Sequence, residues 1–283
     1  MLFVPPHGPS AIQTHVTATT NETATFAITV TAHANVNTVG SYVELIAATT
    51  YESYGIMVQL AGVQTTASEN QGCLVNIAIG AAGSEIILIP NLTCGNVATY
   101  AAASSGAVFY YFPICIPAGV RVSANCQAST TVRAMSVAVR LFQNMIGTQW
   151  YGSRVTAYGA DAANSRGTSH TPSQNSYNTA TELIASTTYP IRAMQLGFDM
   201  LSDTTGATSS YLVRIGYTAT PIYVASELPV RESTTIEAVQ FTDANFILSQ
   251  MRFNIPAAQS LRISAMRAAA TPEARGWIVY GVD

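Results

Sequence analysis

The chain carries the stretch E-L-I-A-A-T-T-Y at Glu44–Tyr51 and repeats it as E-L-I-A-S-T-T-Y at Glu182–Tyr189. The two copies differ only where Ala48 is replaced by Ser186. A match of this length within one chain indicates an internal repeat rather than chance. An internal repeat decides the fold of the whole chain, so the extent of its register is the first thing to establish.

The same register extends over most of the chain. Three further pairs of segments align, namely Cys73–Ile77 with Tyr211–Ile215, 116–118 with 255–257 and, after a small insertion, Arg121–Ala124 with Arg262–Ala265. We interpret the chain as a tandem duplication of one domain of roughly 110 to 140 residues, which is a common domain size.

Each repeat has the pattern of short β-strands. Ile56, Val58 and Leu60 alternate with other residues at a period of two, and the second copy alternates in the same places. There Met194, Leu196 and Phe198 are expected to point inward, and Gln195, Gly197 and Asp199 outward. About eight such strands per repeat are separated by Gly, Pro, Asn and Ser, and we found no helical periodicity. We therefore predict an all-β chain of two tandem antiparallel β-sandwich domains, jelly-roll-like in type.

The repeat divides the chain into four parts. We expect an extended N-terminal arm over 1–23, β-sandwich repeat 1 over 24–143, an inter-domain linker over 144–166, and β-sandwich repeat 2 over 167–283. The residues of the arm and linker that are candidates for subunit interfaces are Pro5, Pro6, Pro9, Trp150 and Tyr151. The prolines exclude helix and interior strand. The two aromatics either pack at a junction between domains or subunits, or cap the core of one domain.

The composition excludes several classes of function. Charged residues make up 10% of the 283 residues, against roughly 25% in typical globular proteins, and all twelve basic residues are arginine. A net charge of −3 without a basic stripe gives no support for nucleic-acid binding. No apolar run approaches the roughly 18 residues of a membrane-spanning helix, and the first residues lack the pattern of a secretory signal.

The cysteines and acidic residues do not suggest chemistry. Cys73, Cys94, Cys115 and Cys126 all lie in the first repeat, so no disulfide framework or metal site is shared by both repeats. We expect free thiols, with a Cys115–Cys126 bridge across a hairpin as the alternative. Glu44 and Glu182 recur in both copies, which suggests a structural role such as accepting backbone donors at a strand start.

We find no catalytic, cofactor-binding or metal-ligating constellation in the sequence. The four histidines fall on predicted arm and loop positions without metal-site spacing, namely His7, His15, His33 and His170. Four acids could be imagined as a carboxylate pair or calcium site, but their spacing matches no calcium loop, namely Asp199, Asp203, Glu227 and Glu232. We expect them to be solvated loop residues, and the chain to be no enzyme.

Two segments of the first repeat resemble virion proteins of tailed bacteriophages. The segment 75–92 reads V-N-I-A-I-G-A-A-G-S-E-I-I-L-I-P-N-L, and the segment 116–128 reads I-P-A-G-V-R-V-S-A-N-C-Q-A. The second repeat keeps the framework but loses the G-A-A-G-S-E loop. The resemblance implies a structural protein of the particle, without catalytic residues to carry over, assembled in the host cytoplasm and located in the virion.

The resemblance implies contacts with the major capsid protein or other virion proteins. Our leading hypothesis is a capsid decoration (cement) protein that stabilises the head, self-associated as a homotrimer. A tail or fibre component of the same particle is the alternative. A carbohydrate-binding module is a further alternative, whose exposed aromatics would come from Tyr110, Tyr111, Trp150 and Tyr151. A glycosidase is disfavoured because no acidic pair recurs in both copies.

Overall fold

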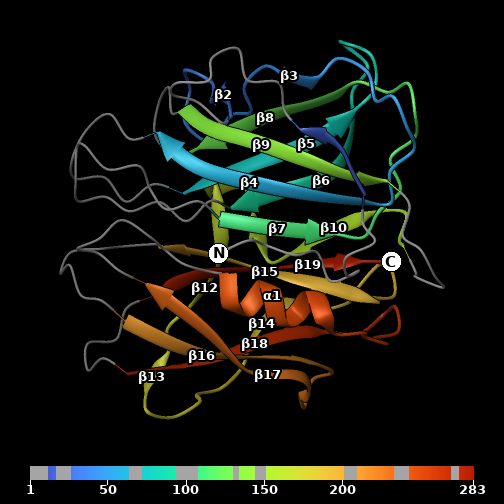
Figure 1. Ribbon diagram of the computed structural model, residues 1–283. Helices are drawn as coiled ribbons and strands as arrows, with labels where there is room; N and C mark the ends of the chain where they lie inside the picture. Colours follow the sequence, from blue (N-terminus) through green and yellow to red (C-terminus); the bar gives the residue numbers. More distant parts are fainter. Residues whose placement is uncertain are drawn as a thin grey trace.

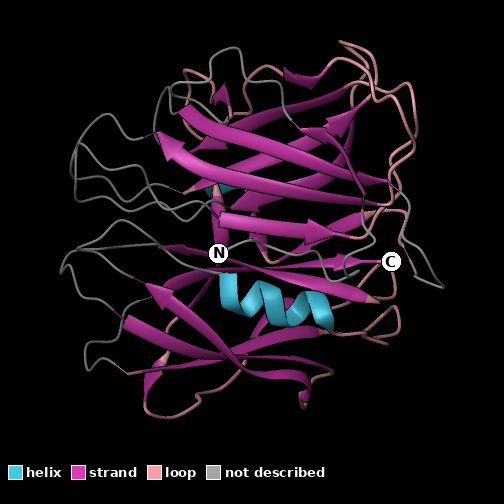
Figure 2. Ribbon diagram, viewed as in Figure 1, coloured by secondary structure: helices cyan, strands magenta, loops and turns pink. Residues whose placement is uncertain are grey.

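The described part of the chain folds mainly into antiparallel β-sheets (Figures 1 and 2). The computed structural model describes residues 12–16, 27–63, 72–93, 108–129, 134–143, 151–200, 209–232, 242–268 and 274–283. Strands β1–β9 form ladders only with one another, and β10–β19 do the same. We call these two sets the first half and the second half.

The first half is a two-sheet sandwich. Its strands are β1 (Ile12–Val16), β2 (Ile28–Thr31), β3 (Val43–Ile46), β4 (Gly55–Val63), β5 (Cys73–Ile79), β6 (Ile86–Thr93), β7 (Val108–Phe112), β8 (Val122–Ala128) and β9 (Ala134–Gln143). The β9 sheet has the order β2-β9-β4-β7, and the β8 sheet has the order β3-β8-β5-β6. This order of eight strands is the jelly-roll arrangement, so the predicted sandwich is confirmed.

The second half repeats this order with one replacement. Its elements are β10 (Val155–Tyr158), β11 (Ala160–Asp161), η2 (Ala162–Asn164), β12 (Arg166–His170), β13 (Ser173–Gln174), β14 (Thr181–Ile184), β15 (Ala193–Met200), β16 (Ser209–Tyr217), β17 (Ile222–Glu232), α1 (Thr242–Gln250), β18 (Leu261–Arg267) and β19 (Arg275–Val282). The β19 sheet contains β12-β19-β15, and the β18 sheet contains β14-β18-β16-β17. Helix α1 follows β17 as β7 follows β6, and it packs against β15.

The repeated stretches hold the repeated I-P-A turns. The hydroxyl of Thr49 donates to the carbonyl of Pro117 at 2.6 Å and accepts the backbone N–H of Val120 at 3.1 Å. In the second half the hydroxyl of Thr187 donates in the same way to the carbonyl of Pro256, at 3.3 Å. Matching bonds in both halves are what a duplication predicts, although the duplication itself stays an interpretation.

The strand register corrects one part of the alignment. Glu44 lies opposite Ser123, and Glu182 lies opposite Arg262, so the backbone aligns Arg262 with Ser123 rather than with Arg121. Both arginines nevertheless reach the recurring glutamates, since Arg121 pairs with Glu44 at 2.9 Å and Arg262 pairs with Glu182. The glutamates therefore bind arginine side chains, not the backbone donors that we expected.

The predicted arm and linker each contain a strand of the adjoining half. Within the arm, Ile12–Val16 forms β1 and pairs with β9. Within the linker, Val155–Tyr158 forms β10 and pairs with β19. In β1 the β-branched residues alternate with others, whereas β10 has two in succession, Val155 and Thr156. Each strand extends a sheet beside the first jelly-roll strand. The boundary at 23 therefore leaves β1 outside the first repeat, and the boundary at 166 leaves β10 and β11 outside the second.

Candidate interaction surfaces

Tyr280 of the second half lies at the centre of the junction between the halves. Its hydroxyl donates to the carbonyl of Asn91 and accepts the N–H of Thr93, both at 2.8 Å. The ring meets that of Tyr110 edge-on, with centroids 5.3 Å apart. Gly197 makes this approach possible, because a Cβ there would lie 2.8 Å from the Thr93 methyl group. Aromatic packing and paired polar groups thus join β6 and β7 to the β19 sheet.

Helix α1 adds a second set of contacts at the junction. The side chain of Asn245 donates to the carbonyl of Phe109 at 3.3 Å and accepts the N–H of Leu196 at 2.7 Å. The side-chain oxygen of Gln195 accepts the N–H of Tyr111 at 3.3 Å. Both amide side chains are buried, so these bonds satisfy groups that would otherwise lose water without replacement.

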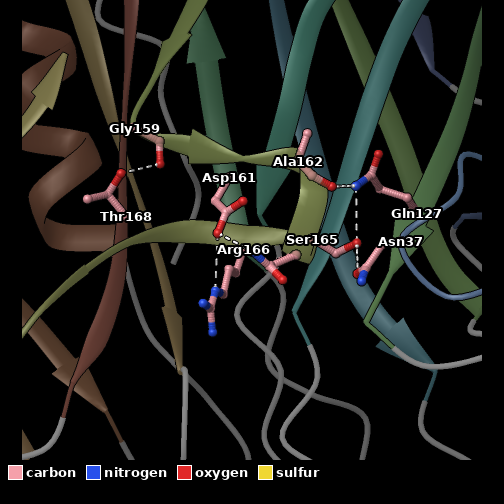
Figure 3. A network of polar contacts seen from close by, with 9 residues as sticks. Asn37, Gln127, Gly159, Asp161, Ala162, Ser165, Arg166 and Thr168 are labelled. Carbon is pink, nitrogen blue, oxygen red and sulfur yellow. Dashed lines mark hydrogen bonds and ion pairs between the residues drawn. The ribbon is translucent and has the colours of Figure 1, made fainter. Parts of the chain in front are cut away.

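The turn from β11 through η2 to β12 is inserted into a socket on the first half (Figure 3). The side-chain amide of Gln127 donates to the carbonyl of Ala162 and to the hydroxyl of Ser165, and that hydroxyl donates to Asn37 at 2.8 Å. A Cβ on Gly72 would lie 2.2 Å from the backbone oxygen of Ser165, so only glycine admits the turn. We call Asn37, Gly72 and Gln127 the turn socket.

The inserted turn is shaped by its own side chains (Figure 3). The carboxylate of Asp161 accepts from the amide of Asn164 at 2.8 Å and pairs with Arg166 at 3.4 Å. The hydroxyl of Thr168 donates to the carbonyl of Gly159 at 2.8 Å. These bonds preorganise the turn before it meets the first half, which lowers the entropic cost of docking.

An open pocket of about 510 Å³ lies on the second half. It sits where β16, β17 and β18 come together at one end of the β18 sheet. Its walls combine apolar and polar side chains, among them Asn175, Ser210, Leu212, Pro229, Met266 and Arg267.

Two hairpins expose large apolar side chains at matching places. Ile86 and Ile87 begin β6 and are 69% and 48% exposed, and Ile222 and Tyr223 begin β17 and are 55% and 41% exposed. Each pair lies opposite the end of the preceding strand, β5 or β16. We call them the hairpin pairs.

A polar cluster lies on the outer side of the β18 sheet. The guanidinium of Arg214 lies 3.6 Å from the centroid of the Tyr177 ring and also approaches Tyr223. It pairs with Glu227 at 2.6 Å, and the Tyr177 hydroxyl donates to the same carboxylate at 2.9 Å. Burial and then this hydrogen bond raise the pKa of Tyr177 to about 12. The groups therefore satisfy one another, and Tyr177 stays protonated at neutral pH.

Of the five interface candidates predicted from the sequence, the structure describes one, Tyr151. Tyr151 is 45% exposed and packs on Tyr54 of the first half, with ring centroids 4.8 Å apart, so it is not buried in the junction. Trp150 and the three prolines Pro5, Pro6 and Pro9 lie outside the described residues. Sequence reasoning missed Tyr280 and Gln195 as contact residues. It placed Gln195 on the outward face of its strand, and it made no prediction for Tyr280.

Two of the four aromatic residues suggested for carbohydrate binding are not exposed. Tyr110 and Tyr111 are buried, so neither presents a ring face to a sugar. Burial raises the pKa of Tyr111. Among the acids, Asp199 lies buried on β15 and Glu227 lies on the exposed outer side of β17, so this pair does not converge. Asp203 and the Glu232 side chain lie outside the described residues.

The described cysteines are free thiols. Cys73, Cys115 and Cys126 form no disulfide, so there is no Cys115–Cys126 bridge, and Cys94 lies outside the described residues. The thiol of Cys115 lies 3.3 Å from the carboxylate of Glu52. Partial burial, then this hydrogen bond and the carboxylate charge, raise the pKa of Cys115 to about 11. It is therefore a poor nucleophile at neutral pH.

His170 departs from the expected loop position, because it lies buried in β12. Its Nε2 accepts the N–H of Ala265 at 3.2 Å, and its Nδ1 lies 2.7 Å from the hydroxyl of Thr181. Burial lowers its pKa, so the imidazole is neutral. Within the described residues, no group of three or more His, Cys, Asp or Glu could hold a metal ion. Nor does that part of the chain contain a helix able to cross a membrane.

Comparison with known proteins places the chain in no family. No family model matches, and no curated protein matches. Similar solved structures include PNGF-II, at 7% identity and a TM-score of 0.35 over 91% of this chain and 65% of that chain. Another is the CBM22-1-CBM22-2 tandem domain of Paenibacillus barcinonensis Xyn10C, at 8% identity and a TM-score of 0.22 over 83% of this chain and 80% of that chain. At such scores no argument about function rests on these likenesses.

Proposed function

We propose that this chain is a structural protein of a tailed-bacteriophage virion, with capsid decoration as its role. The resemblance of 75–92 and 116–128 to virion proteins supports the class of protein. The observation that carries the role is the hairpin pairs, Ile86–Ile87 and Ile222–Tyr223, exposed at matching places in two tandem sandwiches. A protein that cements a shell of identical subunits needs such an apolar contact more than once.

The test is rebinding to particles stripped of this protein. Replacing both hairpin pairs by serine should abolish cosedimentation, because each pair removes apolar surface from the contact. The matched control replaces Val36 and Val39, which are also exposed, by serine and should bind like the wild type. Equal binding by all three proteins would remove the hairpin pairs from the contact, and no binding by the wild type would reject the proposed function.

The tail or fibre role remains the alternative within the same class. A cryo-EM map of the particle separates the two roles, because decoration places many copies over the head and a tail part places few at one vertex. Self-association, with a homotrimer as the expected state, stays a prediction for sedimentation to test.

A further inference from the structure

The open pocket on the second half corresponds in position to the turn socket on the first half. Asn37 and Asn175 both adopt positive φ, at 55° and 52°. The N–H of Asn37 donates to the carbonyl of Ala128 at 2.7 Å, and that of Asn175 donates to the carbonyl of Arg267 at 2.9 Å. Since Ala128 and Arg267 end β8 and β18, the two asparagines occupy the same place in the two halves.

The rest of the pocket follows the same register. The N–H of Ser129 donates to the carbonyl of Gly72 at 3.0 Å, and that of Ala268 donates to the carbonyl of Ser210 at 3.1 Å. Where β5 pairs with β8, Leu74 lies opposite Gln127, and where β16 pairs with β18, Leu212 lies opposite Met266. Ser210 and Met266 thus stand where the turn socket has Gly72 and Gln127. Among the residues that the structure describes, one half holds a polypeptide turn at this site, and the other half leaves it open.

The open site has lost the features that receive the turn of this chain. Ser210 brings a Cβ to the place where Gly72 must have none. Met266 has no amide to donate, whereas Gln127 donates to both Ala162 and Ser165. Beside Leu212, which corresponds to Leu74, the apolar Met266 and Pro229 replace the polar Gln127 and Thr93. We call Leu212, Met266 and Pro229 the apolar floor of the pocket.

The surrounding junction is changed as well. Pro229 stands where the first half has Thr93, whose N–H binds Tyr280, and proline has no N–H to offer. In the first half, Arg140 of β9 occupies the position that Tyr280 of β19 occupies in the second half. A second copy that docked its first half here would therefore present Arg140 instead of a tyrosine. A second copy of this chain therefore lacks the groups that make the contact between the two halves, which disfavours head-to-tail growth through that contact.

We propose that the open pocket binds a surface turn of a partner protein, with an apolar side chain at the tip of the turn. The tip would rest on Leu212, Pro229 and Met266, and the backbone of the turn would face Asn175 and Ser210. A polypeptide turn is the occupant because the corresponding socket holds one on the same framework. The identification of the partner as a neighbouring virion protein rests on the proposed function, whereas the turn-binding site does not.

The site can be tested without the particle. A displayed library of disulfide-closed turn peptides is selected against the full chain, and the affinities of enriched peptides are measured. We expect enrichment of turns with an apolar tip residue, and at least a tenfold loss of affinity for Met266→Arg, which puts a charge on the apolar floor. Ser210→Arg, at the exposed rim of the pocket, should lower the affinity for these peptides in the same way. Ala185→Arg, at an exposed position elsewhere on the second half, should bind them with wild-type affinity.

Several outcomes would overturn the site. Peptides without an apolar tip, no enrichment at all, or equal binding by Met266→Arg would each reject it, provided that the melting temperature shows the variant to be folded. Sedimentation of the wild type and Met266→Arg tests the other occupant, because a dimer lost in the variant would identify a second copy instead. Failure of the wild type to bind particles would reject the proposed function but leave the peptide result standing.

Discussion

Thr49 and Thr187 show what the repeated stretch does in the molecule. Each is buried, and each ties the stretch to the I-P-A turn that lies far away in sequence. The turn places Ala258 at a positive φ of 60°, where Gly119 stands in the first half, and this conformation costs a residue with a side chain more than it costs glycine. The threonine hydroxyl satisfies polar groups of the turn in both copies, and in the second copy it also offsets that strain.

Replacing Thr187 by valine should lower the free energy of unfolding by about 1–3 kcal/mol. Valine keeps the shape but leaves the carbonyl of Pro256 and the N–H of Gln259 without their partner. Denaturant titration measures the loss. Thr188→Val is the matched control, because Thr188 is the adjacent threonine and is exposed. A loss no larger than that of the control would show that the clamp contributes nothing to stability.

At the scale of elements, the period-two pattern predicted the central strands and their inner faces. Ile56, Val58 and Leu60 of β4 are fully buried, as predicted. The pattern cannot show what covers the other face, so Gln195 and Asp199 were expected in solvent. Both are buried, and Gln195 contacts the first half at the junction. Helix α1 was missed because, among its described side chains, the buried apolar ones are only Ala244 and Leu248, four residues apart in one short segment.

The short strands β1 and β10 were missed for a different reason. The prolines of the arm and the polar residues of the linker dominate the composition of those segments, and four or five alternating residues carry little signal against them. The candidate sites were also beyond the sequence. The turn socket joins Asn37, Gly72 and Gln127 with the turn around Ser165, and only the fold brings these residues together.

Deleting residues 1–11 should leave the melting temperature unchanged, whereas deleting 1–23 should lower it. Only the longer deletion removes β1, which pairs with Arg140–Gln143 of β9 and covers that edge. A loss of about 1 kcal/mol corresponds to roughly 2–4 °C for a chain of this size. Thermal unfolding measures both. If the arm contacts a neighbouring subunit, deleting residues 1–11 should weaken rebinding to particles. A lower melting temperature of this variant would show instead that residues 1–11 contribute to the stability of the folded chain.

At the scale of the whole molecule, the β19 sheet is covered on both faces. Trp277 and Val279 face the core of the second half with Phe198 and Leu196 of β15. On the opposite face, Tyr280 meets the first half. An element buried from both sides couples the stability of the two halves, so they are expected to unfold together rather than as independent domains.

Tyr280→Phe tests this coupling. The variant keeps the ring that packs on Tyr110 and Phe112 but removes the hydroxyl. The N–H of Thr93 then loses its acceptor, and the carbonyl of Asn91 loses the donor that Tyr280 supplies. Leaving buried polar groups unpaired costs about 1–3 kcal/mol, and that cost falls on the junction rather than on either core.

We expect the single calorimetric transition of the wild type to broaden or divide into two in Tyr280→Phe, with amide exchange rising first in β6 and β15. Tyr217→Phe, which removes a hydroxyl from a partly exposed position on β16, should keep one transition. Two transitions already present in the wild type would show that the halves are independent. A single unshifted transition in Tyr280→Phe would show instead that packing of the rings alone couples them.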